Sequence, residues 1–474
     1  MTGKITRLYK NLFYDISFSG DIVRIHMLGI KGSGMSSLSI ILKQLGHDVS
    51  GSDVSKKSFT EVELENNNLI CNDFSIKNLE GVELLIVGHS FINTDNIELV
   101  FAKEHNIRTI EYNQYLSQLI SNYYSIAVSG SNGKTTTTGL IACILDAVED
   151  TSYLIGNSQG KGNYKSKYFV FEACEHKEHF LVYKPNVVLV NNIDYDHVDY
   201  YKTREDYIKA FYKFISNSKD KVVVNGDDDN LKSLSNVIFF GINNKSMFNA
   251  RNIRYENGAE YDLYYKDDKL GHVSLAYYGE YMVYDSLAAL TVALCLGVDI
   301  NVAITAIKKF NGLKRRFKET IVNDDVYIDD YAHHPSKIKA TIEAVKQKYP
   351  RKKIIAFFRP DRVPRLNYFS SSFAEELLKA DKAYILPFIN NKHEEKESIN
   401  TFIFNYPDIE LADNRVYKMV SEYNGVCYLM MSSKDMSEVK ESILKYKGDY
   451  CEFKKDYSMF SFFRCYSSLP YSSY

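Results

Sequence analysis

Residues 124–148 read YSIAVSGSNGKTTTTGLIACILDAV, an apolar run that passes through a glycine-containing turn into a second apolar run. The first run has the character of a buried strand, and the second has that of a helix. A loop between a strand and a helix can direct backbone N–H groups at phosphate oxygens, and the helix N-terminus adds positive potential. This stretch therefore predicts a nucleotide-binding α/β domain.

The loop is a short form of the phosphate-binding pattern, because Val128 stands where the full pattern has its first glycine. We expect Lys134 to reach the β- and γ-phosphates of ATP and the Thr135 hydroxyl to bind Mg²⁺. A glycine turn with a solvated lysine is the alternative, which the flanking strand and helix disfavour. The residues predicted to bind ATP here are Gly130, Ser131, Asn132, Gly133, Lys134, Thr135 and Thr136.

Two polar side chains follow strand-like runs near this loop, Glu172 after YFVF and His197 after NNIDYD. The carboxyl ends of parallel strands line one crevice, so both could help to bind a second Mg²⁺. An imidazole is an unusual ligand for such a hard cation. The pattern E-x-x-E-H-x-x-H, with Glu175, His176 and His179, raises a zinc site as an alternative. A solvated or hydrogen-bonded helix face is the favoured interpretation of that pattern.

Residues 22–120 alternate strand-like and helix-like runs, which predicts a first domain with a parallel sheet. Its first strand ends in Gly29-x-x-Gly32-x-Gly34, and Asp53 follows 19 residues after Gly34. This spacing is a weak nucleotide fingerprint. Asp53 could bind a ribose hydroxyl or simply cap a turn.

Length and composition set the limits of these interpretations. A chain of 474 residues is too long for one core, so we predict domains at 1–122, 123–312 and 313–474. Residues 246–276 alternate polar and apolar side chains, as antiparallel strands do.

The net charge of -2 gives no reason to expect nucleic acid or a membrane as a partner. Seven cysteines without a C-x-x-C pair, and the lack of a signal peptide, favour a cytoplasmic protein, expected to be a monomer or weak dimer.

Several segments, in this order, resemble the Mur ligase family: GIKGSGMSSL, GSD, GSNGKTTTTGL, YFVFEACE with HFLVYKP, NNIDYDHVDYY, NGDD, GLKRRF and DDYAHHP. The likeness covers residues 22–445 and is greatest to the members that add L-alanine to UDP-N-acetylmuramate, in the version of low-GC Gram-positive bacteria. It implies a Rossmann-like first domain that binds the UDP-sugar and a central ATP-binding domain with a parallel sheet. It also implies a Rossmann-like third domain that contacts the amino acid.

The resemblance also implies a mechanism. The lactyl carboxylate of the sugar attacks the γ-phosphate of ATP to give an acyl phosphate, which the amine of the amino acid then attacks. Lys134 and Mg²⁺ neutralise charge on the transferring group. By position, Thr135, Glu172 and His197 match metal ligands, and Lys134, Glu172, His197 and His333 match catalytic residues.

Further roles follow from the same match. Asp285 falls at the adenine contact, and Arg316 and Asp330 fall where the third domain holds ATP. The amino acid and product carboxylate would meet His333, Arg362 and Arg365. Without the match, Arg316 could be solvated, Asp330 a turn former and His333 a packing residue. The UDP-sugar site would comprise Gly29, Gly32, Ser33, Gly34, Met35, Ser36 and Asp53.

The sequence departs from the family pattern mainly in its last third. Arg359 and Asp361 replace a glutamine and a histidine, Asp285 replaces an asparagine, and Ser432-Ser433-Lys434-Asp435 replaces a glycine-containing turn. Asn132 replaces a histidine of the alanine-adding members. Two alternatives therefore remain open: a related ligase for another amino acid or acceptor, and a catalytically degenerate UDP-sugar-binding relative. An NAD-type oxidoreductase is disfavoured, because it needs no second phosphate loop.

We also predict that Leu12, Phe13, Ile16 and Phe18 pack on the first domain.

Overall fold

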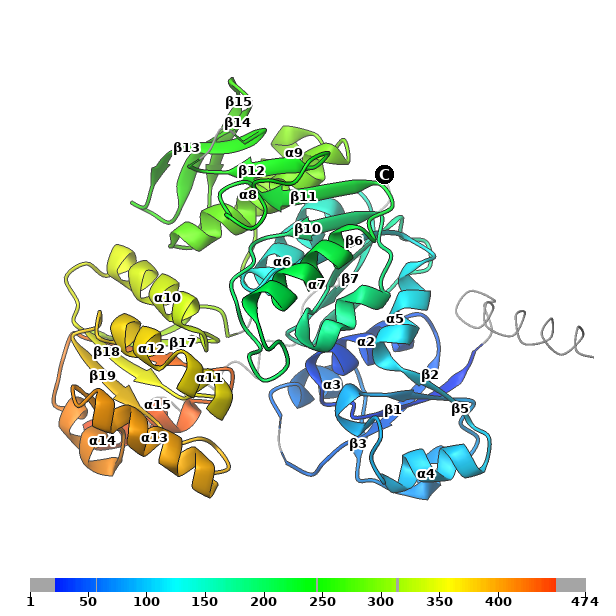
Figure 1. Ribbon diagram of the computed structural model, residues 1–474, viewed down its shortest axis with the longest axis horizontal. Coiled ribbons are helices and arrows are strands. Elements are labelled where there is room, and N and C mark those ends of the chain that lie inside the picture. The colour runs from blue at the N-terminus through cyan, green and yellow to red at the C-terminus, as the bar shows by residue number, and fades with distance from the viewer. Residues whose placement is uncertain (1–21, 57, 244–245, 313–314, 449–474) are drawn as a thin grey trace, which may run out of the picture. The chain divides into compact units, whose positions relative to one another are not determined.

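The computed structural model describes residues 22–56, 58–243, 246–312 and 315–448. The chain divides into two compact units, Met1–Lys314 and Arg315–Tyr474, which contain three sheets (Figure 1). The predicted three-part α/β architecture is confirmed. The N-terminal apolar side chains predicted to pack on the first domain lie outside the described residues, and so does the C-terminal tail. Among the described helices, none is both long and apolar enough to cross a membrane.

The first sheet of unit 1 has five parallel strands in the order β3-β2-β1-β4-β5. The strand order reverses between β1 and β4, and ligands of such sheets bind at this switch point, beyond the carboxyl ends of the strands. The turn after β1 contains Gly29, as the sequence predicted. The elements are β1 (Arg24–Leu28), α2 (Ser33–Gln44), β2 (Asp48–Ser52), α3 (Glu61–Asn66), β3 (Cys71–Asn72), η1 (Ile76–Leu79), β4 (Leu84–Val87), η2 (His89–Phe91), α4 (Ile97–Glu104), β5 (Arg108–Glu111) and α5 (Tyr112–Ile120).

The second sheet of unit 1 has ten strands, in the order β15-β14-β13-β12-β11-β10-β6-β9-β7-β8. The phosphate-loop strand β6 lies between β9 and β10 and is parallel to both, as the sequence predicted. At one edge, β13, β14 and β15 are antiparallel, which confirms the prediction for residues 246–276. The elements are β6 (Tyr124–Ser129), α6 (Lys134–Asp146), β7 (Thr151–Ile155), β8 (Gln159–Lys161), β9 (Tyr168–Glu172), η3 (His176–Val182), β10 (Val187–Val190), α7 (Arg204–Ile215), β11 (Lys221–Asn225), β12 (Ile238–Gly241), β13 (Phe248–Arg254), β14 (Glu260–Tyr265), β15 (Asp268–Ser274), α8 (Glu280–Cys295) and α9 (Ile300–Lys308).

The two sheets of unit 1 share one hydrophobic core. Leu38 and Ile41 of α2 belong to the same buried cluster as Phe169 of β9. Helix α2 packs on the β7–β8 hairpin, where the Ser37 hydroxyl donates to the Ile155 carbonyl at 2.8 Å. Gly160 allows this approach, because a Cβ there would collide with the Ser37 carbonyl. The sugar-binding and ATP-binding regions expected from the sequence are therefore parts of one packed body.

Unit 2 contains a six-stranded sheet in the order β16-β17-β21-β18-β19-β20, in which only β16 runs antiparallel to its neighbour. Tyr327, Phe357 and Tyr428 of the sheet share a buried cluster with Val416 of α14 and Ile443 of α15. The elements are β16 (Lys318–Val322), β17 (Asp325–Asp330), α10 (Pro335–Lys348), β18 (Ile354–Phe358), α11 (Val363–Tyr368), α12 (Ser370–Leu377), β19 (Lys382–Ile385), α13 (His393–Asn405), β20 (Ile409–Leu411), α14 (Asn414–Ser421), β21 (Cys427–Met431) and α15 (Ser437–Lys447).

Candidate active site

The phosphate loop has the backbone geometry that the sequence predicted. Gly130 and Gly133 have φ of 136° and 81°, a region that favours glycine, and α6 begins at Lys134. No side chain caps this helix, because its N-cap residue is Gly133, so its first-turn amides are not engaged by a capping side chain. A Cβ at Gly133 would collide with the carboxylate of Asp285, which lies beside the loop. The uncapped amides at the start of the helix suit a phosphate group.

Two asparagines at the end of β10 hold the loop in place. The Asn192 side-chain oxygen accepts from the Asn132 amide at 2.9 Å, and its carbonyl accepts from the Ser131 amide at 3.1 Å. The Asn191 side-chain nitrogen donates to the Thr137 hydroxyl at 2.9 Å. Neither asparagine is among the residues predicted from the sequence. Their position at the end of a strand beside the loop strand was the available signal.

The loop lysine forms an ion pair with a buried glutamate. Lys134 Nζ lies 2.9 and 3.1 Å from the two carboxylate oxygens of Glu175, and it also donates to the Gly130 carbonyl at 2.5 Å. The Glu175 side chain is only 2% exposed. Burial alone would raise the pKa of Glu175, but Lys134 and His197 outweigh it and hold that pKa at about 2. The pKa of Lys134 is raised, because the nearby Glu175 outweighs the effect of burial. Both groups are therefore charged.

Glu175 is also the centre of a hydrogen-bond network that the sequence did not reveal. The Tyr207 hydroxyl lies 2.8 Å from the Ser131 hydroxyl and donates to the Glu175 carboxylate at 3.4 Å. The Tyr201 hydroxyl donates to the Glu175 carbonyl at 2.5 Å. Ser131 in turn accepts from the Asp194 amide at 2.9 Å. The network connects the phosphate loop to the segment after β9 and to helix α7.

Glu172 is the last residue of β9 and His197 follows β10, the two strands that flank β6, but the two side chains face different partners. The Glu172 carboxylate accepts from the Gly156 amide at 2.5 Å. His197 Nε2 lies 3.6 Å from the Glu175 carboxylate, and His197 has a φ of 53°. A non-glycine residue in this region is uncommon and is enriched at functional sites. Glu172 lies at a strand end as expected, whereas His197 lies in the loop seven residues beyond β10; their joint action on a metal stays a prediction.

The helix face expected for the E-x-x-E-H-x-x-H pattern does not form. Residues 176–182 make a 3₁₀ segment in which Lys177 and Glu178 have left-handed backbone conformations. These two residues break the helical spacing, so Glu172 and His179 do not share a regular helix face. The zinc arrangement considered from that spacing is therefore wrong. Hydrogen bonding, as in the favoured interpretation, is present at Glu175, although not on a helix face.

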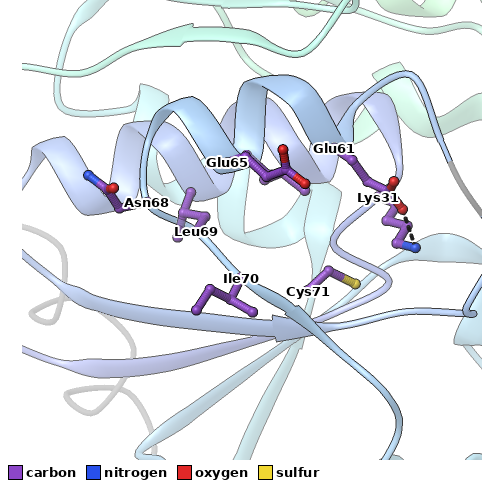
Figure 2. A pocket seen from close by; sticks show the side chains of 8 residues that line it. Lys31, Glu61, Glu65, Asn68, Leu69, Ile70 and Cys71 are labelled. Carbon is purple, nitrogen blue, oxygen red and sulfur yellow. Dashed lines mark ion pairs between the residues drawn. The ribbon is translucent and has the colours of Figure 1, made fainter.

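Asp53 and Lys31 organise the turn after β1. Asp53 accepts from the Lys31 and Val54 amides, both at 2.8 Å, so it caps the turn in this structure. The Lys31 ammonium pairs with Glu61 and donates to the Val54 carbonyl at 2.9 Å. Next to this pair is a cavity of about 430 Å³, which Figure 2 shows between α3 and the β3 strand. Its lining residues are Lys31, Glu61, Leu64, Glu65, Asn68, Leu69, Ile70 and Cys71.

The other residues predicted to bind the UDP-sugar differ in accessibility. Gly32 is the N-cap of α2 and Ser33 is its first residue, so both are at the end of the helix that faces the turn. A Cβ at Gly34 would come within 2.5 Å of the Tyr112 hydroxyl. Met35 and Ser36 are buried inside the domain, with 5% and 0% exposure. A ligand at this turn can therefore reach the helix N-terminus more readily than these two side chains.

In unit 2, Asp330 and Arg316 have structural contacts of their own. Asp330 accepts from the Phe317 and Ala332 amides at 2.8 and 2.9 Å, and from the Thr341 hydroxyl at 3.2 Å. It therefore forms a turn, as one of the two interpretations expected. The Arg316 guanidinium lies over the Tyr331 ring, 4.7 Å from its centroid.

His333 also contacts this segment, since its Nδ1 lies 2.8 Å from the Tyr331 carbonyl. Its ring meets the Tyr331 ring edge-on, with centroids 5.2 Å apart. Asp330, Arg316 and His333 are thus held together around the turn after β17. Their contacts with ATP or an amino acid stay predictions.

The residues that depart from the family pattern contact one another. Asp361 Oδ1 lies 2.6 Å from Arg365, and the Ser433 hydroxyl donates to Asp361 Oδ2 at 3.1 Å. The Ser432 hydroxyl donates to the Arg359 carbonyl at 2.9 Å. Burial raises the pKa of Asp361, but His333, Arg365 and Arg362 outweigh it and hold that pKa at about 2. Asp361 therefore neutralises one of the arginines expected to meet a carboxylate.

Three domain families match the sequence in the order of these features. The Mur ligase family catalytic domain matches residues 24–124, the Mur ligase middle domain matches 128–293, and the Mur ligase glutamate ligase domain matches 315–419. The chain belongs to the Mur ligase family. It is thus an ATP-dependent amide ligase of the class that builds peptidoglycan precursors.

Solved structures share the fold. UDP-N-acetylmuramate-alanine ligase MurC from Thermotoga maritima is 22% identical, covers 91% of this chain and 99% of its own, and has a TM-score of 0.76. A murein peptide ligase from Psychrobacter arcticus is 24% identical, with 90% and 99% covered and a TM-score of 0.69. MurF ligase from Thermotoga maritima, in complex with ADP, is 19% identical, with 85% and 96% covered and a TM-score of 0.58.

Proposed function

We propose that this ligase joins L-alanine to the lactyl carboxylate of UDP-N-acetylmuramate through an acyl phosphate. The observation that carries the proposal is the charged Lys134–Glu175 pair at the phosphate loop, with His197 3.6 Å from the same carboxylate. A half-buried, charged lysine beside uncapped helix amides can neutralise a transferring phosphoryl group. The choice of L-alanine is supported by the motif resemblance and by the fold shared with an alanine ligase.

The residues present fit ATP and Mg²⁺. Gly130 and Gly133 let the loop backbone pack closely against Asn191 and Asp285, and the start of α6 has no side-chain cap. The residues that would hold ATP are those of the loop, 130–136, with Asp285 beside it, and Arg316 and Asp330 in unit 2. Thr135, Glu172 and His197 would hold Mg²⁺, which withdraws charge from phosphoryl oxygens when bound. A MurF ligase of the same fold has been solved with ADP.

The protein's own groups prepare the phosphate site. Glu175 and the Gly130 carbonyl hold the Lys134 ammonium at the loop before a nucleotide arrives. An arriving γ-phosphate would compete with Glu175 for that ammonium, since both are anions. Tyr207 and His197 also contact the Glu175 carboxylate, so they can stabilise it when Lys134 turns to the phosphate. In this way Lys134 is positioned without leaving a buried charge unpaired.

The sugar and the amino acid would bind in different units. The turn after β1, with Gly29, Gly32, Ser33 and Asp53, would receive the UDP-sugar, and the neighbouring cavity of about 430 Å³ could hold part of it. We assign the amino acid to unit 2, where His333, Arg362 and Arg365 lie near Asp361.

A second candidate function is ligation of a different amino acid. The observation that favours it is the Asp361–Arg365 pair, whose side chains are 11% and 4% exposed. This pair reduces the positive charge available to an amino-acid carboxylate. It also places a carboxylate where the family has an imidazole.

A screen of amino acids for phosphate release tests both candidates. The full chain is given ATP, Mg²⁺, UDP-N-acetylmuramate and one amino acid at a time. We expect the highest kcat/KM with L-alanine. A higher value with another amino acid would establish the second candidate, and no sugar-dependent release with any amino acid would contradict both.

A further inference from the structure

Three potential metal ligands converge beside the phosphate loop. One ligand atom each from His176, His197 and Asp199 lies within 4.8 Å of the other two, the single such group among the described residues. The His176 and His197 rings are 4.5 Å apart, and His176 Nε2 lies 3.9 Å from the Asp199 carboxylate. A zinc ion holds tetrahedral ligand atoms about 3.4 Å apart, from bonds of about 2.0–2.2 Å. Small side-chain rotations therefore suffice to bring the three around one ion.

A second observation is a buried nitrogen without a hydrogen bond. His197 Nδ1 is inaccessible and has no hydrogen-bond partner among the described residues. Buried ring nitrogens almost always have a partner, so an orphaned one indicates a missing water or ion. The His197 side chain is 12% exposed, whereas Asp199 is 34% exposed. His197 thus forms the buried end of the group and Asp199 the solvent-exposed end, so an ion can enter from the side of Asp199.

Two local turns of the backbone place the side chains of this group next to one another. Left-handed conformations at Lys177 and Glu178 turn the chain directly after His176, and His197 itself has a φ of 53°. The His197 carbonyl accepts from the Tyr200 and Tyr201 amides, both at 2.9 Å. This turn brings Asp199 back beside His197. Local turns, rather than a helix face, therefore bring the ligands together.

We propose that His176, His197 and Asp199 bind a borderline-soft divalent transition-metal ion of the zinc type. Two imidazoles and one carboxylate suit Zn²⁺, Co²⁺ or Ni²⁺, whereas Mg²⁺ prefers oxygen ligands. Three protein ligands leave a fourth position for water. The site differs in its ligands from the Mg²⁺ site proposed above and shares only His197 with it.

The shared histidine has a consequence that rests on the proposed function. An ion held by His176, His197 and Asp199 removes His197 from the Mg²⁺ site. Zn²⁺ and Mg²⁺–nucleotide should therefore exclude each other, and Zn²⁺ should inhibit phosphate release. Binding of the transition metal itself needs neither nucleotide nor catalysis.

Titration of the metal-free full chain with Co²⁺ tests the site, with visible absorption as the readout and no nucleotide present. We expect one equivalent to bind with the spectrum of a four-coordinate N/O site, and excess Mg²⁺ not to displace it. His176→Ala and Asp199→Asn should each weaken binding at least about tenfold, since loss of even an outer-shell partner has this effect. The matched control is His179→Ala, whose ring is 6.0 Å from that of His176 but which is not a ligand; it should bind as the wild type does.

The outcomes separate this inference from the proposed function. Equal Co²⁺ affinity in the wild type, His176→Ala and Asp199→Asn would overturn the site, as would displacement of Co²⁺ by excess Mg²⁺. Asp199 is on the surface, so its variant keeps the test valid if His176→Ala does not fold. Phosphate release without Co²⁺ binding would overturn only the metal site. Co²⁺ binding without sugar-dependent phosphate release would overturn only the ligase proposal.

Discussion

Each unit contains an ion pair near its predicted site, and the two pairs differ in whether their residues follow the family pattern. In unit 1, Lys134 pairs with Glu175, which is 41 residues away in sequence, and both residues belong to segments that match the family. In unit 2, Arg365 pairs with Asp361, four residues away in sequence, and Asp361 stands where the family has a histidine. The first pair holds a cation ready for phosphate, whereas the second neutralises a cation expected to meet a carboxylate. The residues predicted to act on phosphate thus follow the family pattern, whereas residues next to those predicted to bind the amino acid depart from it.

Removal of the loop lysine is expected to have the largest effect. Lys134→Ala should lower kcat for sugar-dependent phosphate release by about 10²–10³-fold, because one preorganised charge at the transferring group is typically worth this much. Initial rates at saturating ATP measure it. The control is Lys167→Ala, an exposed lysine of the same unit, which should leave the rate unchanged. Substrate-dependent release that persists in Lys134→Ala would contradict the assigned ATP site.

Acid should weaken unit 2 through Asp361. Its pKa is about 2 in the folded chain against an ordinary value of 3.8, so its contribution to stability is present above pH 3.8 and is lost as the pH falls toward 2. The loss should be on the order of 2 kcal/mol. Denaturant unfolding of the full chain between pH 5 and 2 measures it, with Asp361→Asn expected to show a shallower dependence. An identical pH dependence in that variant would show that Asp361 is not the group concerned.

Neutralising Glu175 should separate binding from catalysis. In Glu175→Gln the carboxamide keeps the shape but no longer competes with phosphate for Lys134 or pairs with His197. We expect kcat to fall about tenfold, as for loss of one charge-assisted contact, while KM for ATP stays the same or falls. Initial rates at varied ATP concentrations measure both constants.

Glu178→Gln, three residues away, is the control for Glu175→Gln and should behave as the wild type. An increase in KM for ATP with unchanged kcat would contradict the role of Glu175 in positioning Lys134.

Restoring the family residue in unit 2 should have the smallest effect. Asp361→His removes the anion that neutralises Arg365, so KM for L-alanine should fall by about threefold to tenfold, equivalent to roughly 1 kcal/mol. Amino-acid titrations at saturating ATP and sugar measure it. Ser433→Gly is a companion variant, because it removes the hydroxyl that donates to Asp361. An unchanged or higher KM for L-alanine in Asp361→His would argue against Asp361 as the cause of an altered amine site.

Local signals in the sequence predicted most of the fold. The apolar runs before Gly29 and Gly130 became β1 and β6, and the alternating stretch at 246–276 became the antiparallel edge. Helix α8 was not predicted, because it is apolar on nearly all sides and buried, so it has no amphipathic period. A helix is recognised in a single sequence by the regular spacing of its apolar side chains, and a helix buried on nearly all sides lacks that spacing.

The phosphate loop was predicted from the residues themselves, because its chemistry lies in one continuous segment. Glycines and a lysine next to a helix start must act on phosphate through local backbone geometry, so residues 130–136 were readable from their order alone. The contacts of Glu175, Asn191, Asn192 and Tyr207 with the loop helix and its residues were not predicted, because each acts across segments that become neighbours only in the folded sheet. The zinc pattern failed for the converse reason, since it assumed a helix that left-handed residues interrupt.

The sequence by itself thus determined the α/β class, the phosphate loop and the membership of an ATP-dependent ligase family, since these depend on local order and composition. Only the tertiary structure decided that Glu175 holds Lys134, that Asp53 caps its turn and that Asp361 neutralises Arg365. It also decided that His176 meets His197 and Asp199. The physical reason is that hydrogen bonds and ion pairs need their atoms within about 4 Å of each other, and chain folding sets those distances.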